Sequence, residues 1–251
     1  MKICPFCTNI QLPSAAICLE CGFEFLTADQ VSPQKPPPAP SVSVRFFSQA
    51  KPATRLLLSM AAAGVFVFIF TLISDKLLGT YSEVSVTFVA SAAIALSVIL
   101  AVGTEWGKIK NLLVSPGFAW WIPAIGGALL FAWFAEAYMA FIQNIFPSME
   151  VGVIGDTDKV VTWISIAILP AIFEEIGFRG IFLNSSRIAL MPKSAELLTA
   201  FVFASIHFTI PFFPVLMALG LALGRLRLLS NSLWPPIVMH GVYNGVIIFL
   251  S

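Results

Sequence analysis

Seven apolar runs follow one another along most of the chain, and each has the pattern of a membrane helix. They cover residues 56–73, 84–102, 118–146, 160–183, 197–210, 212–223 and 234–250. A helix needs about 20 apolar residues to cross the hydrocarbon layer of a bilayer, so most of these runs predict spanning helices. Pro211 and Pro214 interrupt the two short runs. That stretch is therefore either one bent helix or two short helices joined by a turn.

The lysines and arginines between the runs decide between these alternatives. If the amino terminus lies in the cytoplasm, Lys76 and Lys159 are the basic residues of the membrane domain that fall outside. This agrees with the positive-inside rule only if the broken stretch crosses the membrane and returns. We therefore expect an all-α polytopic membrane protein with about seven transmembrane helices. The basic residues assigned to the cytoplasm are Arg45, Lys51, Arg55, Lys108, Lys110, Arg179, Arg187, Lys193, Arg225 and Arg227.

The composition excludes an ordinary soluble domain. The chain is 58% hydrophobic and 11% charged, and its mean hydropathy is +0.92. Soluble domains average about 25% charged residues. The formal net charge of +1 gives no indication of a nucleic-acid or acidic partner. The composition thus predicts an integral membrane protein.

A separate small unit precedes the first apolar run. Its four cysteines are all the cysteines of the chain and form two CxxC pairs, Cys4 with Cys7 and Cys18 with Cys21. Two such pairs are typical of a tetrahedral Cys4 zinc site. The alternative is a pair of disulfides, but a segment ahead of an uncleaved first span is expected in a reducing compartment. We predict a structural zinc ribbon over residues 1–27.

A proline-rich linker, residues 28–53, joins this ribbon to the membrane domain at 54–251. Prolines at 33, 36, 37, 38 and 40 predict an extended spacer. In residues 1–27 Lys2 is the one basic residue, against Glu20 and Glu24, so we expect a protein partner for the ribbon and no nucleic acid. A compact membrane chain with such a ribbon suggests a prokaryotic cell membrane.

Two glutamates and an arginine break the apolar run at 160–183. Ionisable groups in membrane segments cost about 2.5–3.5 kcal/mol each, so a functional site is their default interpretation. Glu175 and Arg179 are four residues apart and share a helix face, whereas Glu174 points elsewhere. We expect Glu175 to form an ion pair with Arg179 and Glu174 to be free for chemistry. The alternative is that all three lie solvated at the end of the span.

Later runs carry the two histidines of the chain, each with a companion one helical turn away. Phe203 precedes His207 by four residues, and Asn244 follows His240 by four. A lone histidine in an apolar helix is more often a hydrogen-bonded core residue than a catalyst. Here two histidines, an asparagine and a free glutamate lie on separate helices, and buried polar groups need partners. We expect these side chains to meet.

These residues carry a resemblance to a known family. Glu174 to Arg179 resembles an EExxxR motif, Phe203 to His207 an FxxxH motif, and His240 to Asn244 an HxxxN motif. The ordered set resembles the CPBP family, the CAAX prenyl protease and bacteriocin-processing intramembrane endopeptidases, also called Abi proteins. The resemblance covers residues 155–251 and leaves the first three helices and the ribbon unexplained.

The resemblance implies an intramembrane endopeptidase that cuts peptide bonds near the cytoplasmic leaflet. Glu174 and His207 would activate the attacking water, and His240 and Asn244 would stabilise the oxyanion. Glu175, Arg179 and Phe203 would support them. The expected partners are the bilayer and a peptide or protein substrate, with a lipid-modified tail as one option.

Two alternatives stay open from the sequence. Glu174, His207 and His240 also form the His2Glu donor set of a catalytic zinc site, although no HExxH helix is present to arrange them, and we favour the metal-free site. A non-catalytic membrane binding or immunity-type scaffold protein would use the same polar cavity to hold a partner peptide. A transporter is disfavoured, since the two halves show no repeat of broken segments.

The ribbon hypothesis predicts that deletion of the ribbon changes which proteins are cleaved, because recruitment would be lost. The measurement is the set and abundance of cleaved proteins in cells that carry either form. Unchanged substrate choice and abundance would exclude recruitment.

Overall fold

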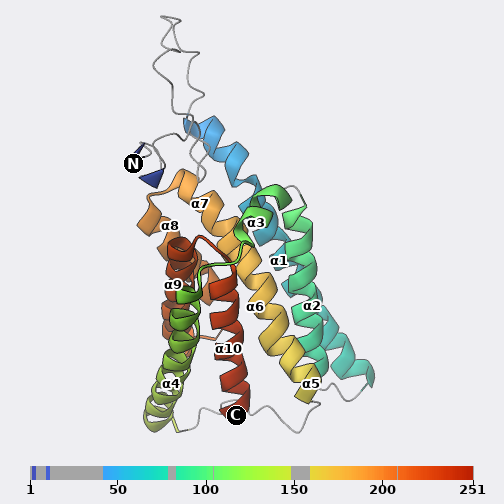
Figure 1. Cartoon of the computed structure of the whole chain (residues 1–251). Helices are drawn as coiled ribbons and strands as arrows, with labels where there is room; N and C mark the ends of the chain where they lie inside the picture. Colours follow the sequence, from blue (N-terminus) through green and yellow to red (C-terminus); the bar gives the residue numbers. More distant parts are fainter. Residues whose placement is uncertain are drawn as a thin grey trace, which may run out of the picture.

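Helices make up most of the computed structural model, which describes residues 2–3, 10–11, 42–78, 83–103, 105–147, 159–207 and 209–250 (Figure 1). Helices form at all seven predicted apolar runs. They are α1 (Val42–Leu78), α2 (Glu83–Val102), α3 (Trp106–Leu112), α4 (Trp121–Ile145), α5 (Lys159–Thr162), α6 (Leu169–Glu174), α7 (Leu183–Ala189), α8 (Pro192–Ser205), α9 (Phe213–Ser230) and α10 (Trp234–Leu250).

Within the described residues, three further helical segments join these elements. A 3₁₀ turn, η2 (Phe118–Trp120), leads into α4. Two π-helical segments, η3 (Trp163–Ile168) and η4 (Glu175–Phe182), join α5, α6 and α7 without a break. We refer to α5 through α7, with η3 and η4, as the long helix.

The length of the helices confirms an integral membrane protein with an all-α polytopic fold. Within the described ranges, four helices are long and apolar enough to cross a membrane: Lys51–Ile73, Phe118–Ile145, Val160–Ile188 and Phe213–Ser230. The pair Phe88–Val102 and Trp106–Leu112, bent by 110°, would make a fifth. The other two predicted spans are shorter, since α10 has 17 residues and α8 has 14.

The broken stretch at 197–223 forms two helices joined by a turn, which was one of the two expected arrangements. Its first helix differs from the prediction of a full crossing. A helix rises about 1.5 Å per residue, so one the length of α8 is about 21 Å long, less than the hydrocarbon thickness of about 30 Å. The helix ends at Ser205, before the predicted apolar run does, and its first turns carry the polar residues Lys193 and Glu196.

The amino-terminal unit is described only at two short strands. β1 (Lys2–Ile3) pairs antiparallel with β2 (Ile10–Gln11), with Lys2 opposite Gln11 and Ile3 opposite Ile10. The predicted zinc ligands Cys4, Cys7, Cys18 and Cys21 lie outside the described residues, as do residues 28–41 of the linker. The zinc ribbon therefore stays a prediction.

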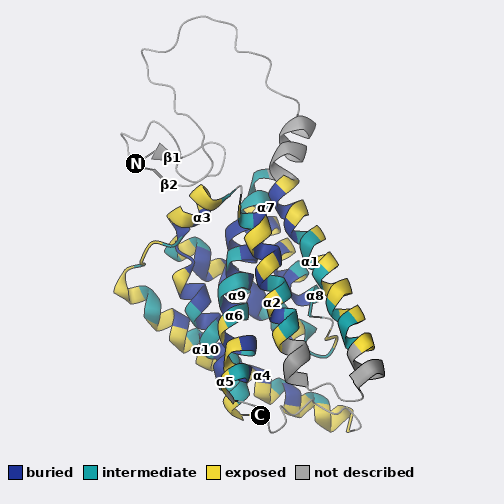
Figure 2. Ribbon diagram, turned by 90° about the vertical axis from the view of Figure 1, so that its right-hand side faces the viewer, coloured by how far each residue is buried: buried dark blue, intermediate teal, exposed yellow. Residues whose placement is uncertain are grey.

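Two apolar clusters form the core, and α10 contributes to both. The first gathers buried residues of α1, α2, α3, the long helix, α8 and α10 around Phe178 and Phe203. The second lies between α4, α9 and α10. There Ala124, Ala128 and Ala132 recur at helical spacing on α4, and such small side chains let two helix backbones approach closely. Buried positions face inward across the bundle (Figure 2).

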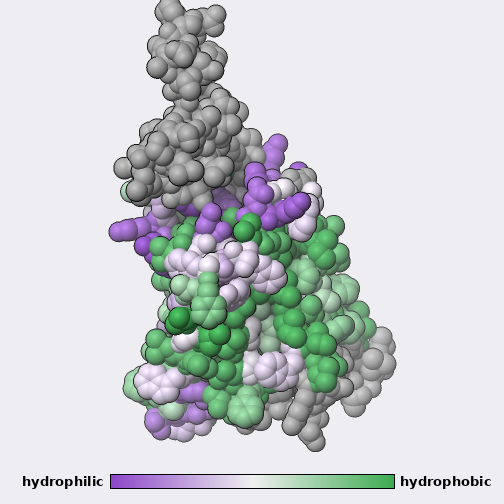
Figure 3. Space-filling model, in the orientation of Figure 1, coloured by the Kyte–Doolittle hydropathy of each residue, from purple (hydrophilic) through white to green (hydrophobic). Residues whose placement is uncertain are grey.

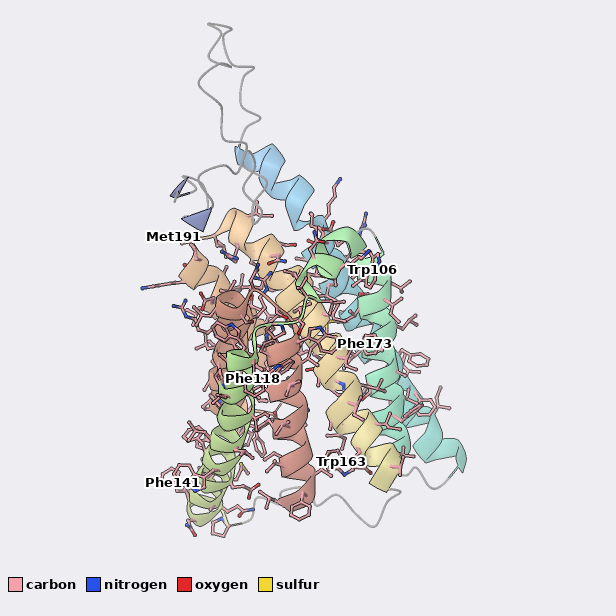
Figure 4. The ribbon with its side chains drawn as sticks, in the orientation of Figure 1. Trp106, Phe118, Phe141, Trp163, Phe173 and Met191 are labelled. Atoms are coloured by element: carbon pink, nitrogen blue, oxygen red, sulfur yellow. The ribbon has the colours of Figure 1, made fainter. Side chains whose placement is uncertain are left out.

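The outer surface of the bundle is strongly apolar, as a hydrocarbon environment requires. Leu100, Trp133 and Phe249 are each more than half exposed. Figure 3 shows hydrophobic side chains over the flanks of the helices and hydrophilic ones gathered mainly toward the upper end. Figure 4 places Phe118 and Phe141 toward opposite ends of the α4 segment.

The start of α10 is fixed by hydrogen bonds to the segment after α3. Leu233 N donates to Leu112 O at 2.8 Å, and Ser232 Oγ donates to Val114 O at 2.7 Å. Trp234 Nε1 adds a bond of 3.0 Å to Leu113 O. These bonds set the position of α10, and with it the position of His240.

Candidate active site

Both glutamates lie on the long helix, at the junction where α6 gives way to π-helical η4. Segments of π-helix are rare and occur frequently at functional sites. Small residues allow neighbouring helices to pack against η4. A Cβ at Gly177 would lie 3.1 Å from Val98 Cγ2, and one at Gly180 would lie 2.7 Å from Ile109 Cδ1. The Glu174–Glu175 pair therefore stands on a backbone that is held closely by α2 and α3.

Glu175 is fully buried and is bound by two partners through a single oxygen. Its Oε1 accepts hydrogen bonds from Arg179 at 2.8 Å and from His240 Nδ1 at 3.0 Å. The ion pair with Arg179 is the one that the four-residue spacing predicted. The bond from His240 was not predicted. It connects the first motif to the third.

Arg179 connects two further helices of the bundle. Its guanidinium donates to Gly220 O on α9 at 3.1 Å and lies over the Phe203 ring of α8, with 4.4 Å between Cζ and the ring centroid. Arg179 is 0% exposed. A buried ion pair is tolerated when additional hydrogen bonds satisfy its donors, and Gly220 supplies one of them.

Glu174 has different surroundings from its neighbour. It is 4% exposed, and its Oε2 accepts no hydrogen bond from any described residue. Glu175 Oε2 has no such partner either, but the other oxygen of that carboxylate is bonded twice. The polar group opposite Glu174 Oε2 is His207 Nε2, at 4.0 Å. The side chain of His207 is 29% exposed, so the site opens toward this histidine.

Hydrogen-bond partners fix which nitrogen of each histidine carries a proton. His207 Nδ1 lies 2.7 Å from Phe203 O, and a carbonyl oxygen can only accept. Nδ1 of His207 is therefore the protonated nitrogen, and neutral His207 presents an acceptor, Nε2, toward Glu174. His240 Nδ1 likewise donates. Its partner, Glu175 Oε1, belongs to a carboxylate that is ion-paired with Arg179, and an ionised carboxylate can only accept.

Phe203 lies between the two histidines. Its ring centroid is 4.9 Å from that of His207 and 5.9 Å from that of His240. The phenylalanine of FxxxH thus contacts both histidines and Arg179. This contact pattern explains why a bulky aromatic side chain is needed there, because it fills the space between three polar groups.

Asn244 is directed toward the long helix. Its Nδ2 donates to Ile166 O, a carbonyl of η3, at 2.8 Å. Asn244 lies one turn beyond His240 on α10, as predicted. Its amide is fixed by this bond, and its second N–H leaves it able to donate elsewhere.

The structure therefore brings the predicted polar residues together in two groups, except Asn244, which bonds the Ile166 carbonyl instead. Glu174 faces His207, and Glu175 binds Arg179 and His240. The carbonyls of Gly220 and Ile166 were missed by the sequence reasoning, because any residue supplies a carbonyl. The bond between His240 and Glu175 was partly predictable. A buried histidine needs a polar partner, but the sequence does not indicate which of the two glutamates it is.

The alternative zinc-binding triad, Glu174, His207 and His240, is divided between these two groups. Among the described residues, no group of three or more histidine, cysteine, aspartate or glutamate side chains has an arrangement that could hold a metal ion. Glu174 and His207 face each other, whereas His240 directs Nδ1 to Glu175.

An apolar groove of about 620 Å³ runs beside the site, between the long helix and α10. Its lining is apolar, with mostly large side chains and a few small residues, Ala167 and Ala171 on the long helix and Gly241 and Gly245 on α10. Trp163, the first residue of η3, also lines the groove. Figure 4 shows this residue low on the long helix and Phe173 above it. Gly241 directly follows His240 on α10, but none of the site's polar side chains lines the groove.

A protein-family model described as Type II CAAX prenyl endopeptidase Rce1-like matches residues 156–246. The matched range holds all three motifs and the helices that carry them. No curated protein and no solved structure matched the chain. The family match supports CAAX-type intramembrane protease activity in general. Residues 156–246 are thus similar to the Rce1-like type II CAAX prenyl endopeptidases, and this match supports the CPBP family for that part of the chain.

Proposed function

We propose that the chain is an intramembrane endopeptidase in which Glu174 and His207 activate a water molecule for attack on a peptide bond. The observation that carries the proposal is the unequal partnering of two adjacent buried acids. Glu175 is held by two cationic or polar donors, whereas Glu174 Oε2 lacks a protein donor. Glu175 Oε2 lacks a donor as well, but its carboxylate is compensated by the two bonds to Oε1, and no such bonds compensate Glu174. Burial of an uncompensated carboxylate costs free energy, so its retention favours a catalytic role.

The gap between Glu174 and His207 suits a water molecule. Their facing atoms are 4.0 Å apart, and a water bonded at about 2.8 Å to each would lie about 2 Å to one side of the line between them. Both atoms are acceptors, since Nδ1 carries the proton of neutral His207. The water would donate both hydrogens and direct a lone pair away from the protein. This is the orientation that attack on a carbonyl carbon requires.

The reaction follows from these roles. The water oxygen forms a bond to the carbonyl carbon while one of its protons moves to Glu174. The carbonyl oxygen becomes an oxyanion. When the C–N bond breaks, the proton held by Glu174 passes to the departing amine. A base within reach of the proton it removes contributes about 10²–10⁴-fold to the rate.

His240 and Asn244 would stabilise the oxyanion. For His240 this role requires a proton on Nε2 as well as on Nδ1, hence the imidazolium form. The Glu175 carboxylate, bonded to Nδ1 at 3.0 Å, holds the ring in place. Glu175 and Arg179 are therefore supporting residues that act through His240. The Asn244 amide would use the N–H that is not bonded to Ile166.

The proposed setting is a prokaryotic cell membrane, with the amino terminus and the site's opening toward the cytoplasm. The substrate is a peptide or protein segment near that leaflet. A lipid-modified substrate would find an apolar groove between the long helix and α10, the helices that carry Glu174 and His240. The zinc ribbon, with structural zinc on its four cysteines, would bind a cytosolic protein.

Replacing Glu174 by Gln preserves the shape of the side chain and removes the base. We expect kcat to fall by about 10²–10⁴-fold, while protein abundance is unchanged. The measurement is comparative peptidomics of cells with the intact chain or Glu174→Gln, which also reveals whether the substrates carry lipid. The matched control is Glu136→Gln, because Glu136 is an exposed residue of α4. This variant should keep full activity.

If the biological activity survived in the Glu174→Gln variant, the proposed protease function would be contradicted. It would favour the non-catalytic binding or scaffold protein, which needs the cavity and not the base.

A metal-free site predicts that a chelator leaves cleavage unaffected once the ribbon is absent. The test uses protein without residues 1–40, after its cleavage activity has been shown to equal that of the full chain, because a chelator also strips the predicted ribbon zinc. Cleavage rates with and without chelator should agree. Persistent inhibition that added zinc reverses would overturn the metal-free assignment.

A further inference from the structure

Gly220 of α9 lies outside the three motifs, yet it touches the residues that organise all of them. Its carbonyl oxygen accepts the hydrogen bond from Arg179, and its Cα faces Ala200 and Phe203 on α8. We propose that Gly220 is a positioning residue, which sets the distance of α9 from α8 and η4 and so holds both halves of the active site in register. The inference rests on the proposed function.

The close approach at Gly220 leaves no room for a side chain. A Cβ there would lie 3.1 Å from both Cα and Cβ of Ala200 and 3.3 Å from Phe203 Cδ1. Two of these three atoms belong to the backbone or to the rigid first carbon of a side chain. A methyl group at 220 would therefore move the two helices apart by a few tenths of an ångström.

Such a movement reaches both halves of the site. Separation of α9 from η4 lengthens the bond from Arg179 to Gly220 O, and Arg179 shares Glu175 Oε1 with His240. A shift of Phe203 displaces the carbonyl that holds His207 Nδ1. One added methyl group would thus disturb the proposed oxyanion donor and the proposed water-binding pair together.

A second connection prevents α9 from moving away from the long helix as a rigid body. Arg227, seven residues after Gly220, donates to Asn184 Oδ1 at 2.9 Å, and Asn184 Nδ2 donates to Gly180 O at 2.8 Å. Helix α9 is therefore attached to the long helix at two levels. Between them lies Gly224, where a Cβ would meet nothing within 4 Å.

The experiment compares Gly220→Ala with Gly224→Ala in the full chain. Both changes add one methyl group to the same helix, but only the first meets a neighbour. We expect Gly220→Ala to lower kcat by about tenfold with KM within about twofold, because misplacement of catalytic groups affects the chemical step. Gly224→Ala should leave both constants unchanged. Ala200→Gly in the Gly220→Ala background removes the opposing methyl group and should restore part of kcat.

A spectroscopic readout makes the test independent of the substrate. The chain has two histidines, so selective ¹⁵N labelling of histidine reports on His207 and His240 alone. Both rings should show a protonated Nδ1 in the parent protein. The signals of both should shift in Gly220→Ala, stay in place in Gly224→Ala, and return toward their original positions in the double variant.

The outcomes separate the two proposals. Histidine signals that are the same in Gly220→Ala as in the parent, even with a lower melting temperature, would overturn the positioning role and leave only packing. Equal kcat in the two alanine variants would overturn it as well. If the parent chain cleaves no peptide, the proposed protease fails, whereas the ¹⁵N comparison still decides whether Gly220 positions the histidines.

Discussion

Glu175 Oε1 accepts hydrogen bonds from Arg179 and from His240 in the interior of an apolar bundle, and the arrangement of the site depends on this shared oxygen. Breaking a buried ion pair by removing one partner costs about 3–5 kcal/mol, because the remaining charge is left uncompensated. The helices that supply the partners are thereby held together. Through Arg179 the same cluster extends to the Phe203 ring and to the Gly220 carbonyl.

This cluster accounts for the presence of a second glutamate. With Glu175 committed to structure, Glu174 can be buried next to His207 without a stabilising donor on Oε2. Local rules of stability are commonly violated at functional sites and compensated elsewhere. Here the violation at Glu174 and the compensation at Glu175 lie on adjacent residues, at the start of a π-helical segment.

Local patterns in the sequence were sufficient for the helices and for the Glu175–Arg179 pair, because both depend on spacing within one element. The partner of His240 was not predictable in this way. It depends on how α10 is rotated against the long helix, and either glutamate suited it. The length of α8 was overestimated because its run of apolar residues was extended through the turn that contains His207.

The backbone carbonyl partners were the least predictable part of the site. Ile166 O and Gly220 O receive bonds from Asn244 and Arg179, and backbone acceptors leave no trace in a sequence. Gly220 and Gly224 look equivalent as a small-xxx-small pair. In the structure, only Gly220 meets a neighbouring helix within 4 Å.

The central claim is that Glu175 acts on the reaction through His240. A double-mutant cycle on the cleavage rate, with Glu175→Gln, His240→Ala and the double variant, tests it most directly. Each single change should lower kcat by about 10²-fold, the size of effect seen when one oxyanion donor is lost. The account predicts that the double variant is no slower than the slower single variant. Losses that multiply would show that Glu175 and His240 act independently and would contradict it.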